Sequence, residues 1–389
     1  MQTRAELTEL TRRLVSVPSH DDETAAGDEI ESWLDEETDA SVTRDDAGNV
    51  LARRGGTGPT LALVGHHDVV PPDPSQVVGG DPDDTTEYVV EERDGRLYGR
   101  GTADMKGAVA ALMLAFRDAD LSPGPGISTD PGATGDPAEV GAPELVFASF
   151  VGEEVGGEGV RAAIDDGFVP DFAVVGEGST NYSKSGVTDV VVAHKGRRAS
   201  TVVARGEACH ASEPERGVNA VYRACDAVDA LREMEPPEAD LYGERLSGTM
   251  AVTGIDGGSA WNVVPERCEV TVDERTVPGK RLFLEGLEEA DGIRVRTDQD
   301  LPPMACEDGA FADLALDAAR EGQDGDPEFV TKPHATDAGW LAAAGTACVV
   351  CGPSEPGEAH TKTESVSVDV LERCYRIYRG AAERFPAEG

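Results

Sequence analysis

The chain has 389 residues, of which 75 are acidic and 34 are basic, so its formal net charge at pH 7 is −41. A surface this negative excludes nucleic acids and anionic membranes as partners, because both carry the same sign of charge. The hydrophobic fraction of 39% is too high for a disordered acidic protein. We therefore expect a folded chain that is long enough for two or three domains.

Most of the basic residues are arginines, since only six of the 34 are lysines. An acidic, lysine-poor surface is typical of a high-salt cytosol, where the Debye length falls to roughly 3 Å at molar salt and self-repulsion is screened. The first 19 residues mix both charges in an amphipathic pattern, which predicts neither a signal peptide nor a transit peptide. No apolar run is long enough to span a bilayer. The sequence thus predicts a halophilic, cytoplasmic protein.

Helices and strands alternate through the first half of the chain. Apolar spacing predicts helices over residues 4–16, 24–36 and 158–166, and another that begins near Gly107. Strands are expected over residues 48–53, 60–66, 144–154 and 171–178. This alternation favours an α/β fold with a mixed, mostly parallel sheet and helices on both faces. Residues 121–143, rich in Gly, Pro, Ser and Asp, are expected to form a long surface loop.

The pattern changes near residue 187 and changes back near residue 300. Between them we expect strands over 188–194, 197–206, 249–256, 267–275 and 292–296, and helices over 217–234 and 280–289. Such a set indicates a small α+β domain with an antiparallel sheet. A helix over 309–321, a strand within 344–353 and a helix over 367–384 then resume the first pattern. The expected organisation is an α/β domain of residues 1–186 and 297–389, interrupted by an α+β domain of residues 187–296.

Polar residues follow the predicted buried strands of the α/β domain. The strand in "LALVGHHD" runs into His66, His67 and Asp68. Because strand side chains alternate, His66 and Asp68 share one face and His67 lies on the other. Comparable positions follow elsewhere in the domain: Asp104 in "GRGTADMKG", Glu153 and Glu154 in "FVGEEVGGE", Glu177 in "VVGEGS", and His360 in "GEAHTKTES".

His66, Asp104, Glu153, Glu154 and Glu177 are expected to converge, because the loops at the carboxyl ends of parallel strands open into the same crevice. Taken singly, each has a simpler explanation: an acidic pair is often a solvated surface pair, and a lone histidine is often a hydrogen-bonded core residue. Their common position after buried strands favours a site, since a buried carboxylate must be paired or must bind a metal.

The residue types in these clusters suit divalent metal ions. Imidazoles and carboxylates are ligands for zinc, cobalt or manganese. Five ligands exceed what one tetrahedral zinc needs, but they suit two ions roughly 3.5–4 Å apart that share a carboxylate. Adjacent Glu153 and Glu154 do not both reach one ion easily from a strand end, so one is expected to bind metal and the other to move a proton.

These motifs resemble a known family over nearly the whole chain. "GHHDVVP", "GRGTADMKG", "GEE", "VVGEGS", "ACHASEPERGVNA", "WNVVPERCEVTVDER" and "EAHTKTES" occur in the order seen in the di-zinc deacylases and metallopeptidases. Members include acetylornithine deacetylase, succinyl-diaminopimelate desuccinylase, aminoacylase and carboxypeptidase G. The resemblance implies a zinc-peptidase-like α/β domain and a ferredoxin-like inserted domain that serves as lid and dimerisation surface. The acidic composition indicates a haloarchaeal-type member of the family.

The resemblance also implies a role for each residue of the α/β domain that matches a motif. One metal ion would be held by His66 and Glu177, and the other by Glu154 and His360, with Asp104 as the bridge. Glu153 matches the general base that activates the attacking water. Asp68 matches the aspartate that orients His66. The implied cofactors are two divalent metal ions, with zinc as the first choice and cobalt or manganese as alternatives.

In the inserted domain, His210 aligns with a histidine that crosses the subunit interface in dimeric relatives and stabilises the oxyanion. Asn262 and Arg275 align with polar residues near the substrate, and Arg275 suits a clamp for a substrate carboxylate. A simpler explanation for His210, which follows Cys209, is an exposed loop histidine. The implied partners are a small N-acyl amino acid or short peptide and a second copy of the chain.

The expected activity is metal-dependent hydrolysis that removes an acetyl or succinyl group from an amino acid. A di- or tripeptidase or a carboxypeptidase of the same family is the alternative enzyme. A protein that keeps the fold but has lost catalysis is a further alternative, although the ligand positions and the base are all present. Finally, the acidic clusters could belong to a halophilic surface that binds no metal tightly.

Overall fold

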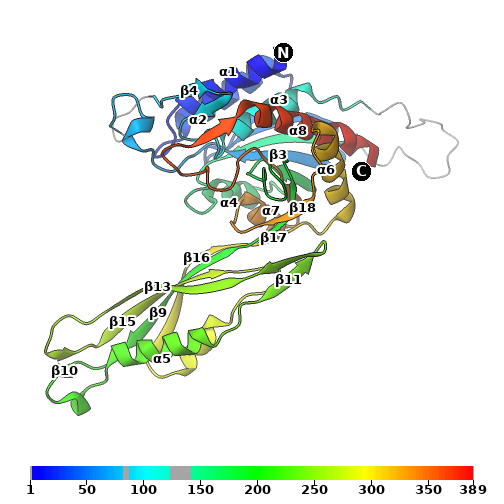
Figure 1. Ribbon diagram of the computed structural model, residues 1–389. Coiled ribbons are helices and arrows are strands. Elements are labelled where there is room, and N and C mark those ends of the chain that lie inside the picture. The colour runs from blue at the N-terminus through cyan, green and yellow to red at the C-terminus, as the bar shows by residue number, and fades with distance from the viewer. Residues whose placement is uncertain (1, 82–86, 123–141, 389) are drawn as a thin grey trace, which may run out of the picture. The chain divides into compact units, whose positions relative to one another are not determined.

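The structure is a computed structural model that describes residues 2–81, 87–122 and 142–388 (Figure 1). Most of the predicted surface loop at 121–143 lies outside these residues. The chain forms two compact units, the first comprising Met1–Val192, Ala305–Thr331 and Thr336–Gly389. The second comprises Ala193–Met304 and Lys332–Ala335, so one unit is inserted into the other, as expected.

A nine-stranded sheet runs through the first unit. Its central strands β6, β3, β7 and β19 are parallel. At one edge β2 pairs antiparallel with β6 and β1 pairs antiparallel with β2, and on the other side β8 pairs antiparallel with β19. The mixed α/β sheet is therefore confirmed, and its parallel strands are the central ones. In sheet order the strands are β1 (Ser41–Arg44), β2 (Val50–Gly55), β6 (Glu144–Phe150), β3 (Thr60–His66), β7 (Phe172–Val175), β19 (Ala347–Val350), β8 (Val190–His194) and β17 (Met304–Ala305), with β18 (Phe329–Lys332) also paired with β8.

Helices cover this sheet, and α3 is the most deeply placed of them. Residues from Lys106 to Phe116 of α3 are all buried, because the helix is apolar on every side and packs between β3 and the outer helices α1 and α8 (Figure 1). On the other side of the sheet, α4 packs against α7 (Figure 1). The helices are α1 (Gln2–Ser16), α2 (Thr24–Glu37), α3 (Lys106–Asp118), α4 (Glu158–Asp165), α6 (Gly309–Gly322), α7 (Asp337–Ala344) and α8 (Val368–Glu388), with a 3₁₀ turn η1 (Pro74–Gln76).

A small sheet ties the last third of the chain to the first. Strand β20 (Ser365–Ser367) pairs with β5 (Arg96–Tyr98), which pairs with β4 (Glu91–Arg93). This pairing places the segment before β20 beside the segment after β5. Among the described residues, no helix has the length and apolar character that crossing a bilayer requires.

The second unit is built on a four-stranded antiparallel sheet in the order β13–β15–β9–β16. Helix α5 covers one face, and Val202, Val270 and Leu231 lie in the core between them. The elements are β9 (Arg197–Arg205), β10 (Cys209–His210), η3 (Pro214–Arg216), α5 (Ala220–Arg232), β11 (Glu238–Leu241), β12 (Glu244–Ser247), β13 (Thr249–Gly257), β14 (Val263–Val264), β15 (Arg267–Arg275), η4 (Leu284–Glu289) and β16 (Ile293–Leu301).

Several details of the second unit differ from the sequence-based expectation. The predicted strand at 188–194 is β8, which belongs to the sheet of the first unit, so the second unit begins later than residue 187. The predicted helix at 280–289 is wrong in type and start. The segment forms the 3₁₀ helix η4, Leu284–Glu289. It starts later than predicted because a turn with Gly279 at φ 73° comes first. The hairpin β11–β12, which turns at Tyr242 and Gly243, was not predicted.

Candidate metal centre

Strand ends deliver several of the predicted ligands to one edge of the first unit's sheet. His66 is the last residue of β3, Glu154 follows β6, and Glu177 follows β7. Carboxyl ends of neighbouring parallel strands meet at the same edge, which brings these side chains together. Asp104 precedes α3, and His360 lies in the loop between β19 and β20.

His66 is surrounded by carboxylates. Its Nε2 lies 3.3 Å from an Asp104 oxygen and 3.3 Å from a Glu177 oxygen. On the other side of the ring, Nδ1 lies 3.1 Å from the backbone carbonyl oxygen of Asp68, which accepts its hydrogen bond, and 3.2 Å from Oδ1 of the same residue. Oδ2 of Asp68 accepts a 3.0 Å hydrogen bond from the backbone N–H of Glu154. Asp68 therefore fixes the His66 ring and also ties the turn after β3 to the turn after β6.

His360 completes the cluster from the far end of the chain. Its Nε2 lies 3.0 Å from an Asp104 oxygen and 2.9 Å from Oε1 of Glu154. The backbone of His360 has φ 64°, a left-handed conformation that is uncommon for a residue other than glycine and often marks functional sites. Asp104 is thus placed between the two histidines, one on each carboxylate oxygen.

The charges in the cluster shift its pKa values strongly. Burial opposes ionisation of Asp104, but hydrogen bonds from His360 and His66 outweigh it and hold the Asp104 pKa well below its usual range. Hydrogen bonds to Asp104 and Glu154 raise the pKa of His360 to about 10. Burial alone would lower the pKa of His66, yet Asp68, Asp104 and Glu177 raise it well above its usual value. The cluster therefore attracts positive charge.

These side chains fit a divalent metal centre. His66, Asp104 and Glu154 each offer a ligand atom, and these three atoms lie within 4.8 Å of one another. Glu177 and His360 each contact one or more of the three, which extends the set to two imidazoles and three carboxylates. Nitrogen and oxygen donors in this mixture suit zinc and its neighbours in the first transition row.

Glu153 lies beside this set without contacting it in an ion pair among the described residues. Burial, together with the negative charges of Asp337, Glu177 and Glu154, raises the pKa of Glu153 well above its usual value. It occupies the glycine-rich turn between β6 and α4, where the N–H of Gly156 donates to its carbonyl oxygen at 3.0 Å. A carboxylate that resists ionisation and lies next to metal ligands suits proton transfer.

Asp337 is a site residue that the sequence-based prediction missed. It is 3% exposed, and neither carboxyl oxygen has a hydrogen-bond partner among the described residues. Burial and the charges of Asp68, Glu177 and Glu154 raise its pKa to about 8. A Cβ on Gly157 would come within 3.2 Å of its Oδ1, so Asp337 lies behind the turn that carries Glu153. The available signal was an N-cap threonine, Thr336, that starts helix α7.

The structure places His210, Asn262 and Arg275 in the second unit, and their predicted roles stay predictions. His210 is exposed and contacts Ser212 through Nδ1 at 2.7 Å. Asn262 is also exposed, and its carbonyl oxygen accepts a 2.9 Å hydrogen bond from the N–H of Ala211, which places it close to His210 along β10 and β14.

Arg275 ends β15 and donates from Nε to Asp273 at 2.8 Å. The same aspartate accepts a hydrogen bond from Nε of Arg197 at 2.8 Å. Asp273 therefore holds both guanidinium groups on one part of the sheet. Burial and the nearby Arg275 charge lower the pKa of Lys195, which adds a third cation to this group.

The raised pKa values predict how the stability of the metal-free protein changes with pH. His360 has a folded pKa of about 10, above its ordinary value of 6.5, so the stability it contributes is complete below pH 6.5 and is lost as pH rises through 10. Asp337 acts in the same direction between its ordinary value of 3.8 and about 8. We expect these two groups to lower the melting temperature of the chelator-treated protein between pH 6.5 and pH 10, as measured by circular dichroism. The buried Lys106, whose pKa is lowered by burial to about 7, acts in the opposite direction above pH 7.

The variant Asp337→Asn is the control for this melting series, because an amide keeps the shape of the neutral acid but does not ionise. The variant should lose the part of the decrease below pH 8 and keep the part above it. Metal-loaded protein should show little of the His360 contribution, because a bound imidazole is already unprotonated. A wild type and an Asp337→Asn variant whose melting temperatures change alike with pH would contradict the protonation state assigned to Asp337.

Comparison with known proteins identifies the family. A sequence model described as a peptidase dimerisation domain matches residues 192–282, and one described as peptidase family M20/M25/M40 matches residues 62–126. Succinyl-diaminopimelate desuccinylase from Thioalkalivibrio sulfidiphilus is 30% identical over 363 residues, which cover 88% of each chain. The chain belongs to peptidase family M20. Acetylornithine deacetylase from Myxococcus xanthus is 29% identical over 368 residues, covering 88% of this M20 chain and 86% of the relative.

Solved structures of M20 proteins share the fold. Aminopeptidase PepT from Bacillus cereus aligns with a TM-score of 0.75 at 20% identity and covers 98% of both chains. A dinuclear metal-binding M20 peptidase from Bacillus subtilis aligns with a TM-score of 0.67 at 16% identity, covering 100% of this chain and 99% of its own. The present M20 protein is therefore a hydrolase of a metal-dependent family, as its motifs predicted.

Proposed function

We propose that this M20 hydrolase removes the acyl group, acetyl or succinyl, from an N-acylated amino acid. The observation that carries the proposal is the convergence of two histidines and three carboxylates at the strand ends of the first unit. The names of the curated relatives support the same class of substrate, since one is a desuccinylase and another a deacetylase. Both reactions hydrolyse an amide whose nitrogen belongs to an amino acid.

In this proposal the centre holds two divalent metal ions, with zinc first and cobalt or manganese as alternatives. His66 and Glu177 would hold one ion, because both lie on the same side of Asp104. Glu154 and His360 would hold the other, since Nε2 of His360 contacts both Glu154 and Asp104. Asp104 would be shared by the two ions, since its two oxygens face His66 and His360 respectively. Bound there, the ions would polarise the acyl carbonyl and acidify water.

The side chains around the ions divide the remaining work. Glu153 would take a proton from the attacking water and return it to the leaving amine. Asp68 would hold the His66 ring in place through the Nδ1 contact. From the second unit, His210 would donate a hydrogen bond to the oxyanion, and Asn262 and Arg275 would bind the polar end of the substrate, with Arg275 on its carboxylate.

A peptidase activity is the second candidate, and the solved structures favour it. Their names include an aminopeptidase, a tripeptidase from Staphylococcus aureus and human carnosine dipeptidase 1, at 15–20% identity and TM-scores of 0.67–0.75. The bond broken would again be an amide, so the same residues would act. The two candidates differ only in what lies on the acyl side of that bond.

A substrate panel separates the candidates. Release of free amine would be measured from N-acetyl-ornithine, N-succinyl-diaminopimelate, N-acetyl-methionine and several dipeptides, in molar KCl, with and without chelator, and after zinc or cobalt is added back. Metal-dependent turnover of one acyl amino acid is expected. Cleavage of dipeptides alone would replace the deacylase by the peptidase. Two bound metals without any cleavage would contradict both.

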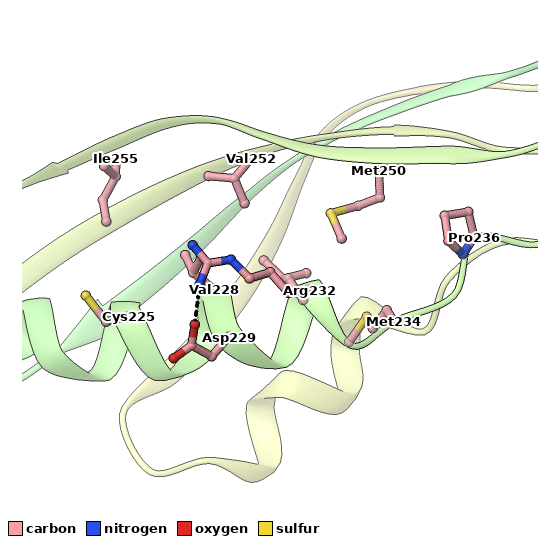
Figure 2. A pocket seen from close by; sticks show the side chains of 10 residues that line it. Cys225, Val228, Asp229, Arg232, Met234, Pro236, Met250, Val252 and Ile255 are labelled. Carbon is pink, nitrogen blue, oxygen red and sulfur yellow. Dashed lines mark hydrogen bonds and ion pairs between the residues drawn. The ribbon is translucent and has the colours of Figure 1, made fainter.

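We also propose that the second unit forms a homodimer through its outer edge. Strand β13 ends the order of the four-stranded sheet, and Val252 and Ile255 on it are 38% and 56% exposed. A groove of about 850 Å³ lies between β13 and α5. In Figure 2, side chains of both elements, including Val228 and Met250, face one another across it. The dimerisation-domain match over residues 192–282 covers both elements, and an open edge invites pairing with another strand.

Charge placed on this edge should therefore prevent dimerisation. The variant Ile255→Asp puts two carboxylates close together across a twofold interface and removes apolar area. In molar KCl, light scattering should give the wild type twice the mass of the chain and the variant the mass of one chain at the same micromolar concentration. Val169→Asp changes a similarly exposed valine of the first unit, 45% exposed, and should leave the dimer intact. A monomeric wild type would contradict the proposal.

The working environment we propose is a cytoplasm of high salt. The net charge of −41 and the presence of only six lysines support it, because such a surface repels itself in dilute buffer. Activity and melting temperature should both rise as KCl is increased from 0.1 M to molar concentrations. A protein that is fully active and stable at 0.1 M salt would contradict this assignment.

A further inference from the structure

A buried ion pair lies directly beside the metal centre. Arg100 and Glu364 are 3% and 1% exposed, and Nη1 of Arg100 donates to Oε2 of Glu364. Neither residue belongs to the candidate ligand group among the described residues. Burying two charges is unfavourable unless further hydrogen bonds satisfy them, so a pair in this place calls for an explanation.

The other oxygen of Glu364 supplies part of that explanation. Oε1 accepts hydrogen bonds from the backbone N–H groups of Ala103 at 3.0 Å and Asp104 at 3.2 Å. Buried N–H groups need an acceptor, and here a carboxylate from a distant part of the chain provides it for two successive residues. The backbone of Asp104 is thereby fixed from behind, while its side chain faces His66 and His360.

The pair also joins the loops that carry the ligands. Nη2 of Arg100 lies 3.4 Å from the carbonyl oxygen of Pro71, in the loop that follows His66 and Asp68. The backbone N–H of Gly99 donates to the carbonyl oxygen of Glu364 at 3.1 Å. Glu364 itself closes the loop of His360, since its N–H donates to the carbonyl oxygen of Thr361 at 3.3 Å. One ion pair therefore connects three loops.

We propose that the Arg100–Glu364 pair is a positioning device that sets the Asp104 bridge relative to His360 before metal binds. The inference rests on the proposed function, in which Asp104 is shared between the ions. Within the device, Glu364 acts as the acceptor that holds the Asp104 backbone, and Arg100 holds that carboxyl group in place. Partners behind metal ligands typically change metal affinity or activity by about 10–100-fold when they are removed.

Loss of the two charges and loss of the hydrogen-bond acceptor at position 364 should affect metal binding differently. Removing the charges together, while keeping an acceptor at position 364, should leave Asp104 in place. Removing the acceptor as well should free the Asp104 backbone and weaken binding of the ion held by Glu154 and His360. The ion held by His66 and Glu177 should be affected less, because the Asp68 contact fixes His66 separately.

Two double variants test this difference. R100M/E364Q keeps an oxygen acceptor, and R100M/E364L has none; neither leaves an unpaired buried charge, so both should fold. Stepwise dissociation constants of Co²⁺ are measured by titrating metal-free protein and following the visible absorption of the bound ion. We expect the second constant of the Gln variant to stay within about threefold of wild type, and that of the Leu variant to rise by about 10–100-fold.

The variant Glu358→Gln is the matched control. Glu358 lies in the same loop as His360 and pairs with Arg96 of β5. Among the described residues it has no hydrogen bond or ion pair with residues 99–105, so both its cobalt constants should equal those of wild type. Hydrogen exchange of residues 99–105 adds a readout on the wild type alone. If the device acts before metal binds, these amides are equally protected with and without Co²⁺.

The outcomes are distinguishable. A wild type that binds no pair of Co²⁺ ions or cleaves none of the panel overturns the proposed function and this inference with it. A wild type that does both, while the Leu and Gln variants bind alike, overturns the inference only. Unprotected hydrogen exchange of the amides of residues 99–105 in the metal-free wild type also overturns the inference.

Discussion

Replacing Glu153 with glutamine is expected to lower the rate of amide hydrolysis by about 10³- to 10⁴-fold, near the upper end of general acid–base effects. Glutamine has the size of glutamate but accepts no proton from water and delivers none to the leaving amine. Because Glu153 makes no ion pair with the five proposed ligands among the described residues, the variant should still bind two metal ions. The measurement is kcat together with metal content by elemental analysis after desalting.

The neighbouring residue provides the control. Glu154 contacts His360 at 2.9 Å, so Glu154→Gln should lose one of the two ions, and its activity should recover in part when the metal concentration is raised. Added metal should not rescue Glu153→Gln. Activity retained in Glu153→Gln would remove the general base from the mechanism, and loss of metal in that variant would make Glu153 a ligand instead.

Replacing Glu274 with alanine is expected to lower the free energy of unfolding of the second unit by about 3–5 kcal/mol. Glu274 is fully buried, and its Oε2 lies 2.7 Å from Nε and 2.6 Å from Nη2 of Arg198. The same Nη2 donates to the carbonyl oxygen of Leu282 at 2.6 Å, which anchors the chain before η4. Alanine would leave the buried Arg198 guanidinium with the half-exposed Glu285, 3.2 Å from its Nη1, in place of a buried counter-charge.

Hydrogen exchange of the β9 and β15 amides would measure this loss within the second unit. Asp229→Ala breaks an exposed pair with Arg232 on α5 and should change the exchange little. The double variant R198M/E274L has no buried charge and should regain most of the lost stability. An Ala variant as stable as wild type would mean that water reaches Arg198 and solvates it.

The candidate site residues at the carboxyl ends of the parallel strands could be predicted from the sequence, because the signals that identify them are local. A buried apolar strand followed by a histidine or carboxylate identifies a strand end, and parallel strand ends share one edge. His66, Glu154 and Glu177 follow this rule, and the structure places them close to Asp104. His360 has no strand directly before it, so only the family resemblance indicated it.

Asp337 and the Arg100–Glu364 pair could not be predicted in this way. The chain has 75 acidic residues, and composition does not distinguish a buried carboxylate from the many exposed ones. Burial of Asp337 depends on α7 packing against α4 in the folded unit, and burial of Glu364 depends on the pairing of β20 with β5. Both are long-range contacts that no local pattern reports.

The second unit shows the same limit in its secondary structure. Its main strands and α5 were predictable from alternation and helical spacing, whereas β8 looks like a neighbour of β9 and yet pairs with β19. A strand's sequence shows that it is buried but not which sheet receives it. The hairpin β11–β12 escaped prediction because the first of the two left-handed residues in its turn is Tyr242, which carries no turn signal, so Gly243 stands alone as a signal.

The strand order also determines when the first unit can be completed during synthesis. β19 lies between β7 and β8 in the sheet, but the ribosome makes it only after the whole second unit. A nascent chain that has emerged as far as Ala335 therefore carries a finished second unit and an unfinished first one, whose β7 has no partner on the side of β19. Such an open edge invites pairing with other chains. His360 arrives with the same late segment, so the metal centre is assembled only at the last stage of translation.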